Sequence, residues 1–437
     1  MKIINEQFVI PKDVVTSPES LKEHLESKIE LSFPASKPIR FFVIQSSKSE
    51  YICEVDLIVF ERDTDVAYFG ESRSIFDHQR RSYEDVEEFI AALVIPTGIG
   101  AEIGGHCGDG SVASRLIASA CDTLITHPNV VNASDINEMT ENTLYVEGGV
   151  LTEFFNGMIG LQKVRSNRIL MLMDQSDDIF FNNEIVNAVS SARVTLGIDC
   201  DVVEMKSAID ADLKFTESGR AAAEIRHFDR LLKTISVYKD NYDAVGLATI
   251  VQIPEEESRA YFASVDNVVN PWGGSEAIIT HSVSAAFGKP AAHSPLSVSM
   301  GDLHLDYGLG IVDPRKAPES ASVAYLHCIL KGLHRAPRIV DFEKGINIEN
   351  VSCLIIPDGC IGLPVLAALS HGIPVIAVKN NNLMNNDLSE LPFMPGKLFY
   401  AENYMEATGI ITALKAGISL DTLRRPIRPT RFFESSV

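Results

Sequence analysis

The chain has 437 residues, and its 38 Lys or Arg against 59 Asp or Glu give a formal net charge of −21. A chain of this length forms two large lobes or about three average domains. Apolar residues make up 46% and charged residues 22%, which is the composition of a folded globular protein and excludes general disorder. The acidic balance argues against nucleic acid as the main partner and against an anionic membrane surface, because both require a basic face.

No apolar run is long enough to cross a membrane, and the N-terminal residues lack the apolar core of a secretory signal. The seven cysteines are scattered, odd in number and without a CxxC pair. That pattern is typical of reduced thiols and not of a disulfide framework or a zinc ribbon. We therefore expect a cytoplasmic protein with no membrane partner.

The first ninety residues differ from the rest of the chain. Two strand-like runs, Ile39–Ile44 and Ile52–Phe60, precede a charged connection. Because these apolar runs are short, residues 1–90 are predicted to form a small α+β module that packs on the main body.

From residue 91 onward, strand-like and helix-like segments alternate, which predicts an α/β fold with parallel sheets. We expect two related doubly wound lobes, residues 91–265 and residues 266–437, the second ending in a basic tail. The expected strands are Ala91–Ile95, Thr123–Thr126, Arg168–Met173, Cys200–Glu204, Ala244–Val251, Ala291–His293, Cys353–Ile356 and Val375–Val378, and the expected helices are Ser111–Ala120, Glu184–Leu196, Arg220–Val237, Ser275–Phe287 and Leu363–Ser370.

Two stretches of the last part share the order loop, helix, Gly-x-Pro turn and strand. The turns are Gly288-Lys289-Pro290 and Gly372-Ile373-Pro374. A glycine that ends a helix and a proline that opens the next element are common helix-stop signals. In parallel sheets ligands bind at the carboxyl ends of the strands, which directs attention to the loops that follow them.

The loop of residues 96–111 contains six glycines between a predicted strand and a predicted helix. Such a backbone can approach an anion closely, although the loop is neither a P-loop nor a clean GxGxxG and specifies no nucleotide. His106 and Cys107 are candidate acid–base or nucleophilic groups, and a tight structural turn is the alternative. The candidate binding residues of this loop are Thr97, Gly98, Gly100, Gly104, Gly105 and Asp109.

A polar loop follows the strand Thr123–Thr126. His127, Asn129 and Asn132 could hydrogen-bond a ligand there, and turn-forming side chains are an equally good explanation.

The stretch of residues 270–295 contains the single tryptophan, Trp272, before a glycine pair and a helix. Glu276 is a candidate base, His281 a second acid–base group, and Lys289 a clamp for an anion; a helix cap and a solvated lysine are the alternative. The candidate binding residues at the start of this helix are Gly273, Gly274 and Ser275.

Asp302, His304 and Asp306 alternate, so a strand would place them on one face. Asp and His are suitable ligands for a divalent metal, and an exposed polar face is the alternative. A metal site is therefore a secondary hypothesis.

Asp358 and Cys360 lie between a strand and a helix near the end of the chain. The helix dipole would lower the pKa of the Cys360 thiol, and Cys107 with Cys360 would suit acid–base chemistry across a cleft; buried inert cysteines are the alternative. Further candidate binding residues are Gly359, Lys379 and Asn380, with Arg315 in a Pro-bounded basic loop facing an anionic substrate.

The motifs IPTGIGAEIGGHCGDG, NPWGGSEAIITH, IVDPRKAPES and IPDGCIGLPVLAALSHGIPV resemble those of a family of unknown function found in cyanobacteria, other bacteria and plastids. The similarity covers roughly residues 90–385. This resemblance implies one α/β body and assigns no catalytic residue.

Together these patterns predict an isomerase, lyase or hydrolase that binds a small anionic substrate in an inter-lobe cleft lined by glycine-rich loops. One alternative is a metal-dependent hydrolase or lyase, and another is a non-catalytic small-molecule-binding or regulatory protein. The sequence specifies no cofactor, with a divalent metal as the alternative, and leaves homo-oligomer formation open. The candidate catalytic residues are His106, Cys107, Glu276, His281, Asp358 and Cys360.

Overall fold

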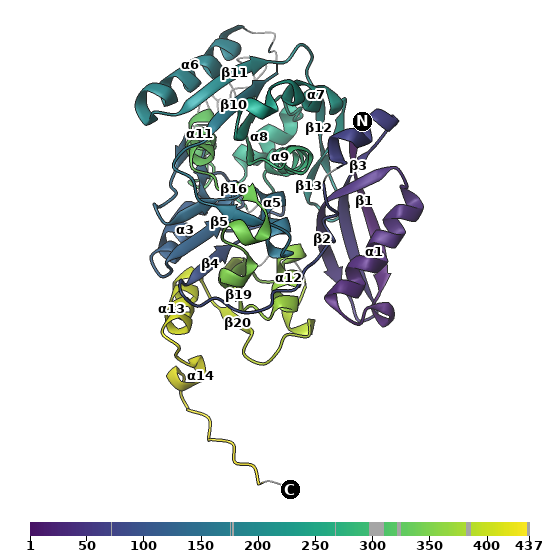
Figure 1. Cartoon of the computed structure of the whole chain (residues 1–437). Helices are drawn as coiled ribbons and strands as arrows, with labels where there is room; N and C mark the ends of the chain where they lie inside the picture. Colours follow the sequence, from purple (N-terminus) through teal and green to yellow (C-terminus); the bar gives the residue numbers. More distant parts are fainter. Residues whose placement is uncertain are drawn as a thin grey trace.

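The computed structural model describes residues 1–70, 72–174, 176, 179–266, 268–296, 310–320, 325–381 and 386–434. These residues form a mixed α/β fold that contains one large antiparallel sheet and two parallel sheets (Figure 1). The expectation of parallel sheets in an α/β protein is confirmed.

The antiparallel sheet has the strand order β12-β13-β1-β3-β2-β18. In β1 most side chains alternate between buried and more exposed positions, as expected for a sheet with one face on the core. The sheet contains strands from the N-terminal part and from two later parts of the chain, and it lies at one side of the molecule in Figure 1. Its strands are β1 (Lys2–Pro11), β2 (Ser36–Ser46), β3 (Glu50–Val59), β12 (Asp210–Phe215), β13 (Ala221–Arg226) and β18 (Ile361–Gly362).

The larger parallel sheet has the order β20-β19-β17-β4-β5-β8. Its central strands are buried along their whole length, which explains their continuous apolar runs. Strands from residues 90–145 pair here with strands from residues 351–401, so segments of both expected lobes share one sheet. The strands are β4 (Ile90–Leu93), β5 (Thr123–Thr126), β8 (Thr143–Tyr145), β17 (Val351–Pro357), β19 (Val375–Val378) and β20 (Leu398–Ala401).

The smaller parallel sheet has the order β11-β10-β14-β15. The long helix α6 and helix α11 pack against each other beside it, and α9 packs between β15 and the antiparallel sheet. Its strands are β10 (Arg168–Met173), β11 (Asp199–Glu204), β14 (Ala244–Ala248) and β15 (Ala291–His293), and the main helices around it are α6 (Ile179–Leu196), α7 (Asp229–Tyr238), α9 (Gly273–Phe287) and α11 (Leu326–His334).

The other elements connect these sheets or cover their faces. Helix α1 begins at Ser17, whose Oγ accepts a hydrogen bond from the Ser20 amide, and it buries Leu21, Leu25 and Ile29. These elements are α1 (Pro18–Ser32), α2 (Asp63–Val66), α3 (Ser111–Ala118), α4 (Pro128–Val131), α5 (Gly148–Phe155), α8 (Glu255–Ala263), α10 (Ala317–Ser320), α12 (Leu363–His371), α13 (Tyr404–Lys415), α14 (Leu420–Leu423), β6 (Asn132–Ala133), β7 (Ile136–Asn137), β9 (Gly160–Gln162) and β16 (Arg338–Val340).

The two Gly-x-Pro turns have the geometry that their sequence predicts. Gly288 ends α9 with φ 58°, and Gly372 ends α12 with φ 68°. Each turn leads into a parallel strand, β15 or β19. The left-handed conformation that stops both helices is accessible to glycine at little cost.

The predicted helix Arg220–Val237 is wrong. Its first part is strand β13, and only Asp229–Tyr238 is helical. The alanines of β13 favour a helix in isolation, but this segment pairs with β1 on one side and β12 on the other. Sheet pairing therefore overrides local propensity here.

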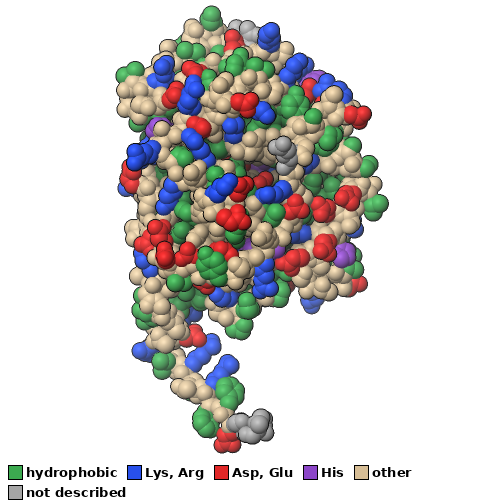
Figure 2. Space-filling view, in the orientation of Figure 1, with side chains coloured by type: hydrophobic (Ala, Val, Ile, Leu, Met, Phe, Trp, Pro, Cys, Tyr) green, Lys and Arg blue, Asp and Glu red, His purple; other side chains and the backbone are tan. Residues whose placement is uncertain are grey.

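None of the described helices is long and apolar enough to cross a membrane. The C-terminal segment from residue 424 to 434 is exposed and extends away from the body in Figure 1. Acidic and basic side chains are intermixed on the face of the body seen in Figure 2, whereas the basic side chains along the tail are arginines.

Candidate functional site

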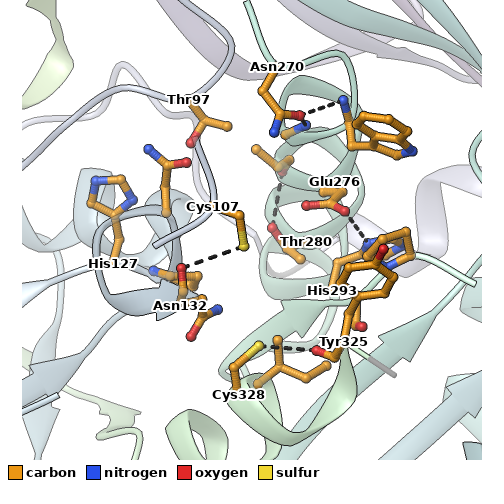
Figure 3. A pocket seen from close by; sticks show the side chains of 18 of the residues that line it. Thr97, Cys107, His127, Asn132, Asn270, Glu276, Thr280, His293, Tyr325 and Cys328 are labelled. Carbon is orange, nitrogen blue, oxygen red and sulfur yellow. Dashed lines mark hydrogen bonds and ion pairs between the residues drawn. The ribbon is translucent and has the colours of Figure 1, made fainter. Parts of the chain in front are cut away.

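A cavity of about 130 Å³ lies where the carboxyl ends of the two parallel sheets meet (Figure 3). Its walls include Thr97 after β4, His127 after β5, Glu147 after β8 and Ser294 after β15. Helix α9 supplies a further wall with Glu276 and Thr280. Strand ends of parallel sheets are where ligands bind in α/β proteins, because the loops there are free to carry polar side chains.

The glycine-rich loop is tightly packed on the antiparallel sheet. Gly98 has φ 79°, and a Cβ there would lie 2.8 Å from the carbonyl oxygen of Ala221. The Ala221 amide in turn donates a hydrogen bond of 2.9 Å to the carbonyl oxygen of Gly98. A glycine is therefore required at position 98 both by its conformation and by the close backbone approach.

The carboxyl group of Asp109 accepts hydrogen bonds from backbone amides of the same loop. The Asp109 Oδ1 atom accepts hydrogen bonds from the amides of Gly104 at 2.7 Å and His106 at 3.3 Å. Burial outweighs these bonds and raises the pKa of Asp109 to about 7. These two amides are thus not available to an anionic ligand.

A buried hydrogen-bond network surrounds Glu319. Tyr261 Oη donates to Glu319 Oε2 at 2.9 Å, and Asn270 Nδ2 donates to the same oxygen at 3.1 Å. His106 Nδ1 lies 2.9 Å from Tyr261 Oη, so the network reaches the glycine-rich loop. Burial raises the pKa of Glu319 to about 7, and the nearby charge of Glu276 adds to this rise. Glu319 can therefore hold or release a proton near neutral pH.

Glu276 pairs with His293 on the same cavity. Their Oε1 and Nδ1 atoms are 3.5 Å apart. A dashed line marks this ion pair in Figure 3. The other ring nitrogen of His293 lies 2.7 Å from Thr249 Oγ1, which orients the imidazole. A carboxylate beside an oriented imidazole is an arrangement suited to accepting a proton.

Glu147 belongs to a second carboxylate–imidazole pair. Its Oε2 atom accepts hydrogen bonds from the amides of Gly149 and Val150 and so caps helix α5, while its Oε1 atom lies 2.7 Å from His281 Nδ1. Burial alone would raise the pKa of Glu147, but His281 and the two amides together hold it below its ordinary value. Glu147 therefore remains ionised.

Three polar residues of the segment after β5, which contains α4 and the start of β6, line the cavity but hydrogen-bond to other parts of the fold. His127 Nε2 accepts a hydrogen bond of 3.1 Å from the Ile95 amide, and burial lowers the pKa of His127 to about 4. Asn129 Nδ2 donates to the carbonyl oxygens of Ile95 and Gly104, and Asn132 Nδ2 donates to Tyr145 Oη. His127 is thus neutral, and both amides fix neighbouring backbone or side chains.

The expected lowering of cysteine pKa values is wrong. Burial raises the pKa of Cys107 to about 12 and that of Cys360 to about 12. Cys107 Sγ accepts a hydrogen bond of 2.9 Å from the Ser134 amide, which favours the thiolate, but burial and the charges of Glu319 and Glu276 favour the thiol. Cys360 lines a different, apolar cavity, so the two thiols do not face one site.

The basic side chains predicted to clamp an anion lie elsewhere among the described residues. Lys289 Nζ donates to the carbonyl oxygen of Tyr242, and Lys379 Nζ pairs with Glu402 at 2.6 Å. Arg315 pairs with Asp313 and with Glu102. Each cation has a partner away from the cavity walls.

The structure thus brings together only part of the predicted set. Asp302, His304 and Asp306 lie outside the described residues, and within those that are described no group of three or more His, Cys, Asp or Glu could hold a metal ion. The predicted residues on the cavity walls are Thr97, Gly98, Gly105, His106, Cys107, His127, Asn129, Asn132, Gly273 and Glu276. The predicted residues not on its walls are Gly100, Gly104, Asp109, Gly274, Ser275, His281, Lys289, Arg315, Asp358, Gly359, Cys360, Lys379 and Asn380.

Several residues of the site were not predicted from the sequence. Glu147 and Glu319 are the most important, and His293 and Asn270 join them. Glu147 stands directly before Gly148-Gly149 and a helix, which is a signal that could have been used. Glu319 lies among proline and serine in an ordinary loop sequence, and only its burial distinguishes it.

The chain is similar to proteins without an assigned activity. A relative from Synechococcus sp. (strain ATCC 27144 / PCC 6301 / SAUG 1402/1), named "Uncharacterized lipoprotein syc1174_c", is 32% identical over 360 residues, which cover 79% of this chain and 96% of the relative. No solved structure matches the chain. The model of the family "Protein of unknown function (DUF3326)" matches residues 90–424 and confirms the resemblance of the motifs. The chain therefore belongs to the DUF3326 family of proteins of unknown function.

Proposed function

We propose that the cavity is the active site of an enzyme that moves protons on a small polar molecule. The observation that carries this proposal is the position of Glu319, a buried carboxyl group with a pKa of about 7, on the same cavity as the Glu276–His293 pair. Glu319 would donate a proton to the substrate and Glu276 would accept one from it. The starting state would be restored when Glu276 releases its proton to solvent and Glu319 takes one up. Separate proton donors and acceptors of this kind are typical of general acid–base catalysis.

The reaction that suits these groups is an isomerisation or an elimination. Both reactions need a proton removed at one atom and delivered at another, without a covalent intermediate. A nucleophilic mechanism has less support, because burial keeps the Cys107 thiol protonated at neutral pH. We therefore propose an isomerase or lyase rather than a thiol-dependent hydrolase.

The cavity favours a substrate that is uncharged at its reacting end. Its described walls contain glutamates and histidines but neither lysine nor arginine. An anionic group would face three carboxyl groups there, those of Glu147, Glu276 and Glu319. The anionic substrate expected from the sequence stays a prediction, and a neutral polar group is our proposal.

Exchange of substrate hydrogen with solvent tests this function. We would incubate the protein with a bacterial metabolite extract in deuterated water and follow masses by liquid chromatography. The expected result is one class of compound that gains deuterium or is consumed with the wild-type protein. Glu319→Gln and Glu276→Gln should slow this change by at least about a hundredfold.

The matched control is Glu256→Gln, which changes an exposed carboxyl group on α8. It should leave the exchange rate unchanged. A compound that binds the wild-type protein without exchange or consumption would overturn the catalytic proposal and favour the non-catalytic binding protein.

We also propose that the substrate enters between two lobes and that the protein acts in the cytoplasm. In support of the first point, the cavity walls come from the carboxyl ends of both parallel sheets. In support of the second point, all seven cysteines are free thiols, as is usual for proteins of a reducing compartment. Fractionation of cells that express the full chain tests this location.

A further inference from the structure

A second cavity, of about 100 Å³, adjoins the proposed active site and has a different character. It lies between β2 of the antiparallel sheet and the carboxyl ends of β4 and β17 in the larger parallel sheet. Most of its walls are apolar side chains. They include Phe41, Val43, Val94, Ile99, Ile356 and Leu363.

The two cavities share one partition. Thr97, His127 and Gly148 line both of them. The Glu147–His281 pair crosses the same partition, since Glu147 faces the active-site cavity and His281 lines the apolar one. A molecule that occupied both cavities would therefore contact polar side chains at one end and apolar side chains at the other.

The charged group at the edge of the apolar cavity is already neutralised. Arg40 is buried, and its guanidinium lies 3.4 Å from Asp56 Oδ2. It also donates hydrogen bonds to the carbonyl oxygens of Gly274 and Thr97. Arg40 thus holds the glycine-rich loop and the first turn of α9 in place, and the described walls of the apolar cavity contain no unpaired cation for an anion.

The volume and walls of this cavity fit a small apolar group. Protein interiors are packed so closely that voids larger than a water molecule are few, because an empty void loses dispersion contacts. An engineered apolar cavity of about 150 Å³ stays dry and binds benzene. The present cavity is of the same order, and Thr97, His127 and Gly148 line both it and the active-site cavity.

We propose that the apolar cavity receives the apolar part of the substrate, which is a short branched chain or a single aromatic ring. The substrate is then amphipathic, and its polar end lies between Glu319 and Glu276. The role of that polar end rests on the proposed acid–base function, whereas the binding of an apolar group does not.

Small probe molecules test the two ends separately. We would measure the affinities of toluene, propanamide and 3-phenylpropanamide for the full chain by ligand-observed NMR. The variant that fills the apolar cavity is Gly362→Phe, because Gly362 lines it, has φ −139°, and a Cβ there meets no atom closer than 3.8 Å. The matched control is Gly409→Phe, at an exposed position of α13 where a Cβ has no neighbour within 4 Å.

The expected result is that 3-phenylpropanamide binds the wild-type protein at least about tenfold more tightly than propanamide. Gly362→Phe should remove that advantage and weaken toluene binding by about tenfold or more, while Gly409→Phe should change neither. Thr152→Phe, on another wall of the cavity, replaces Gly362→Phe if the latter does not fold.

Toluene binding that is equal in the wild type and in the filled variant would overturn the proposal. So would an affinity of 3-phenylpropanamide no greater than that of propanamide. Failure of the acid–base function would show elsewhere, as undiminished solvent exchange in Glu319→Gln, and it would leave the toluene result unchanged. The two proposals can therefore fail independently.

Discussion

Glu147 Oε1 and His281 Nδ1 lie 2.7 Å apart across the partition between the two cavities. Glu147 caps α5 and His281 projects from α9, and these two helices pack against each other. The close approach depends on Gly148, because a Cβ at that position would lie 2.7 Å from His281 Cε1. The absence of a Cβ at Gly148 thus allows the ion pair to form.

Gly148→Ala should therefore displace the His281 ring and weaken its contact with Glu147. We expect a loss of about 1–3 kcal/mol in the free energy of unfolding, as for other overpacked interiors. Urea denaturation followed by circular dichroism measures this loss. Gly409→Ala is the control, since it lies in helix α13 with open space around it and should stabilise the protein by about 0.5–1 kcal/mol. Equal effects of the two substitutions would contradict the steric argument.

Glu319 should make the stability of the protein fall as pH rises. Its pKa is raised from 4.5 to about 7 in the folded state, so the folded protein retains this proton after the unfolded chain has lost it. Stability linked to Glu319 is therefore fully present below about pH 4.5 and is lost as pH rises through about 7. Glu319→Gln removes this dependence because the amide does not titrate.

The measurement is the free energy of unfolding of both proteins at pH 5 and pH 8. Between pH 5 and pH 8, the free energy of unfolding of Glu319→Gln should rise relative to that of the wild type by up to roughly 3 kcal/mol. Asp109, whose pKa is also raised to about 7, titrates in both proteins, and the comparison therefore reports Glu319 together with its coupling to Asp109. A difference between the two proteins that does not change with pH would show that Glu319 is ionised throughout.

The cysteine thiols should react slowly in the folded protein. Because burial raises the pKa of Cys107 and of Cys360 to about 12, the thiolate fraction near neutral pH is very small. Iodoacetamide labelling followed by mass spectrometry should show both residues unmodified under conditions that label all seven cysteines in urea. Cys107→Ser should retain the hydrogen bond from the Ser134 amide and leave catalysis within about threefold of the wild type. Rapid labelling of Cys107 would contradict this prediction and support the hypothesis that Cys107 is a nucleophile.

Arg220 should be essential to the antiparallel sheet. Its guanidinium pairs with Glu54 at 2.9 Å and with Asp56 at 3.1 Å, and all three side chains are buried. Arg220→Met leaves buried Asp56 with Arg40 and Asn5, and buried Glu54 with the Ser218 hydroxyl, which should cost about 3–5 kcal/mol in the free energy of unfolding. Thermal denaturation at low and high salt tests this, since a buried cluster is screened little.

Arg226→Met is the matched control for Arg220→Met. Arg226 is the last residue of β13, the strand that begins directly after Arg220, and it pairs with Asp212 at 2.7 Å, but both side chains are about half exposed. Its loss should cost less than about 1 kcal/mol. A similar cost for the two substitutions would mean that burial does not determine the strength of these pairs.

Local patterns predicted the parallel strands well. Thr123–Thr126, Arg168–Met173, Ala291–His293 and Val375–Val378 occur with the bounds expected for them, because each contains a short apolar run. The ends of α9 and α12 were also predictable, since glycine stops both. The antiparallel sheet was less predictable, because the sequence of β13 favours a helix and only its pairing with β1 and β12 makes it a strand.

The sequence by itself determined which segments are apolar, where helices stop, and which loops follow the strands. These properties depend on neighbouring residues, so they can be inferred from spacing alone. The tertiary structure decided which of those loops meet. It placed Glu276 beside Glu319 and His293, separated Cys107 from Cys360, and paired the candidate lysines with distant groups. Burial, which sets the pKa of a carboxyl or a thiol, is a property of the assembled fold, and no local pattern contains it.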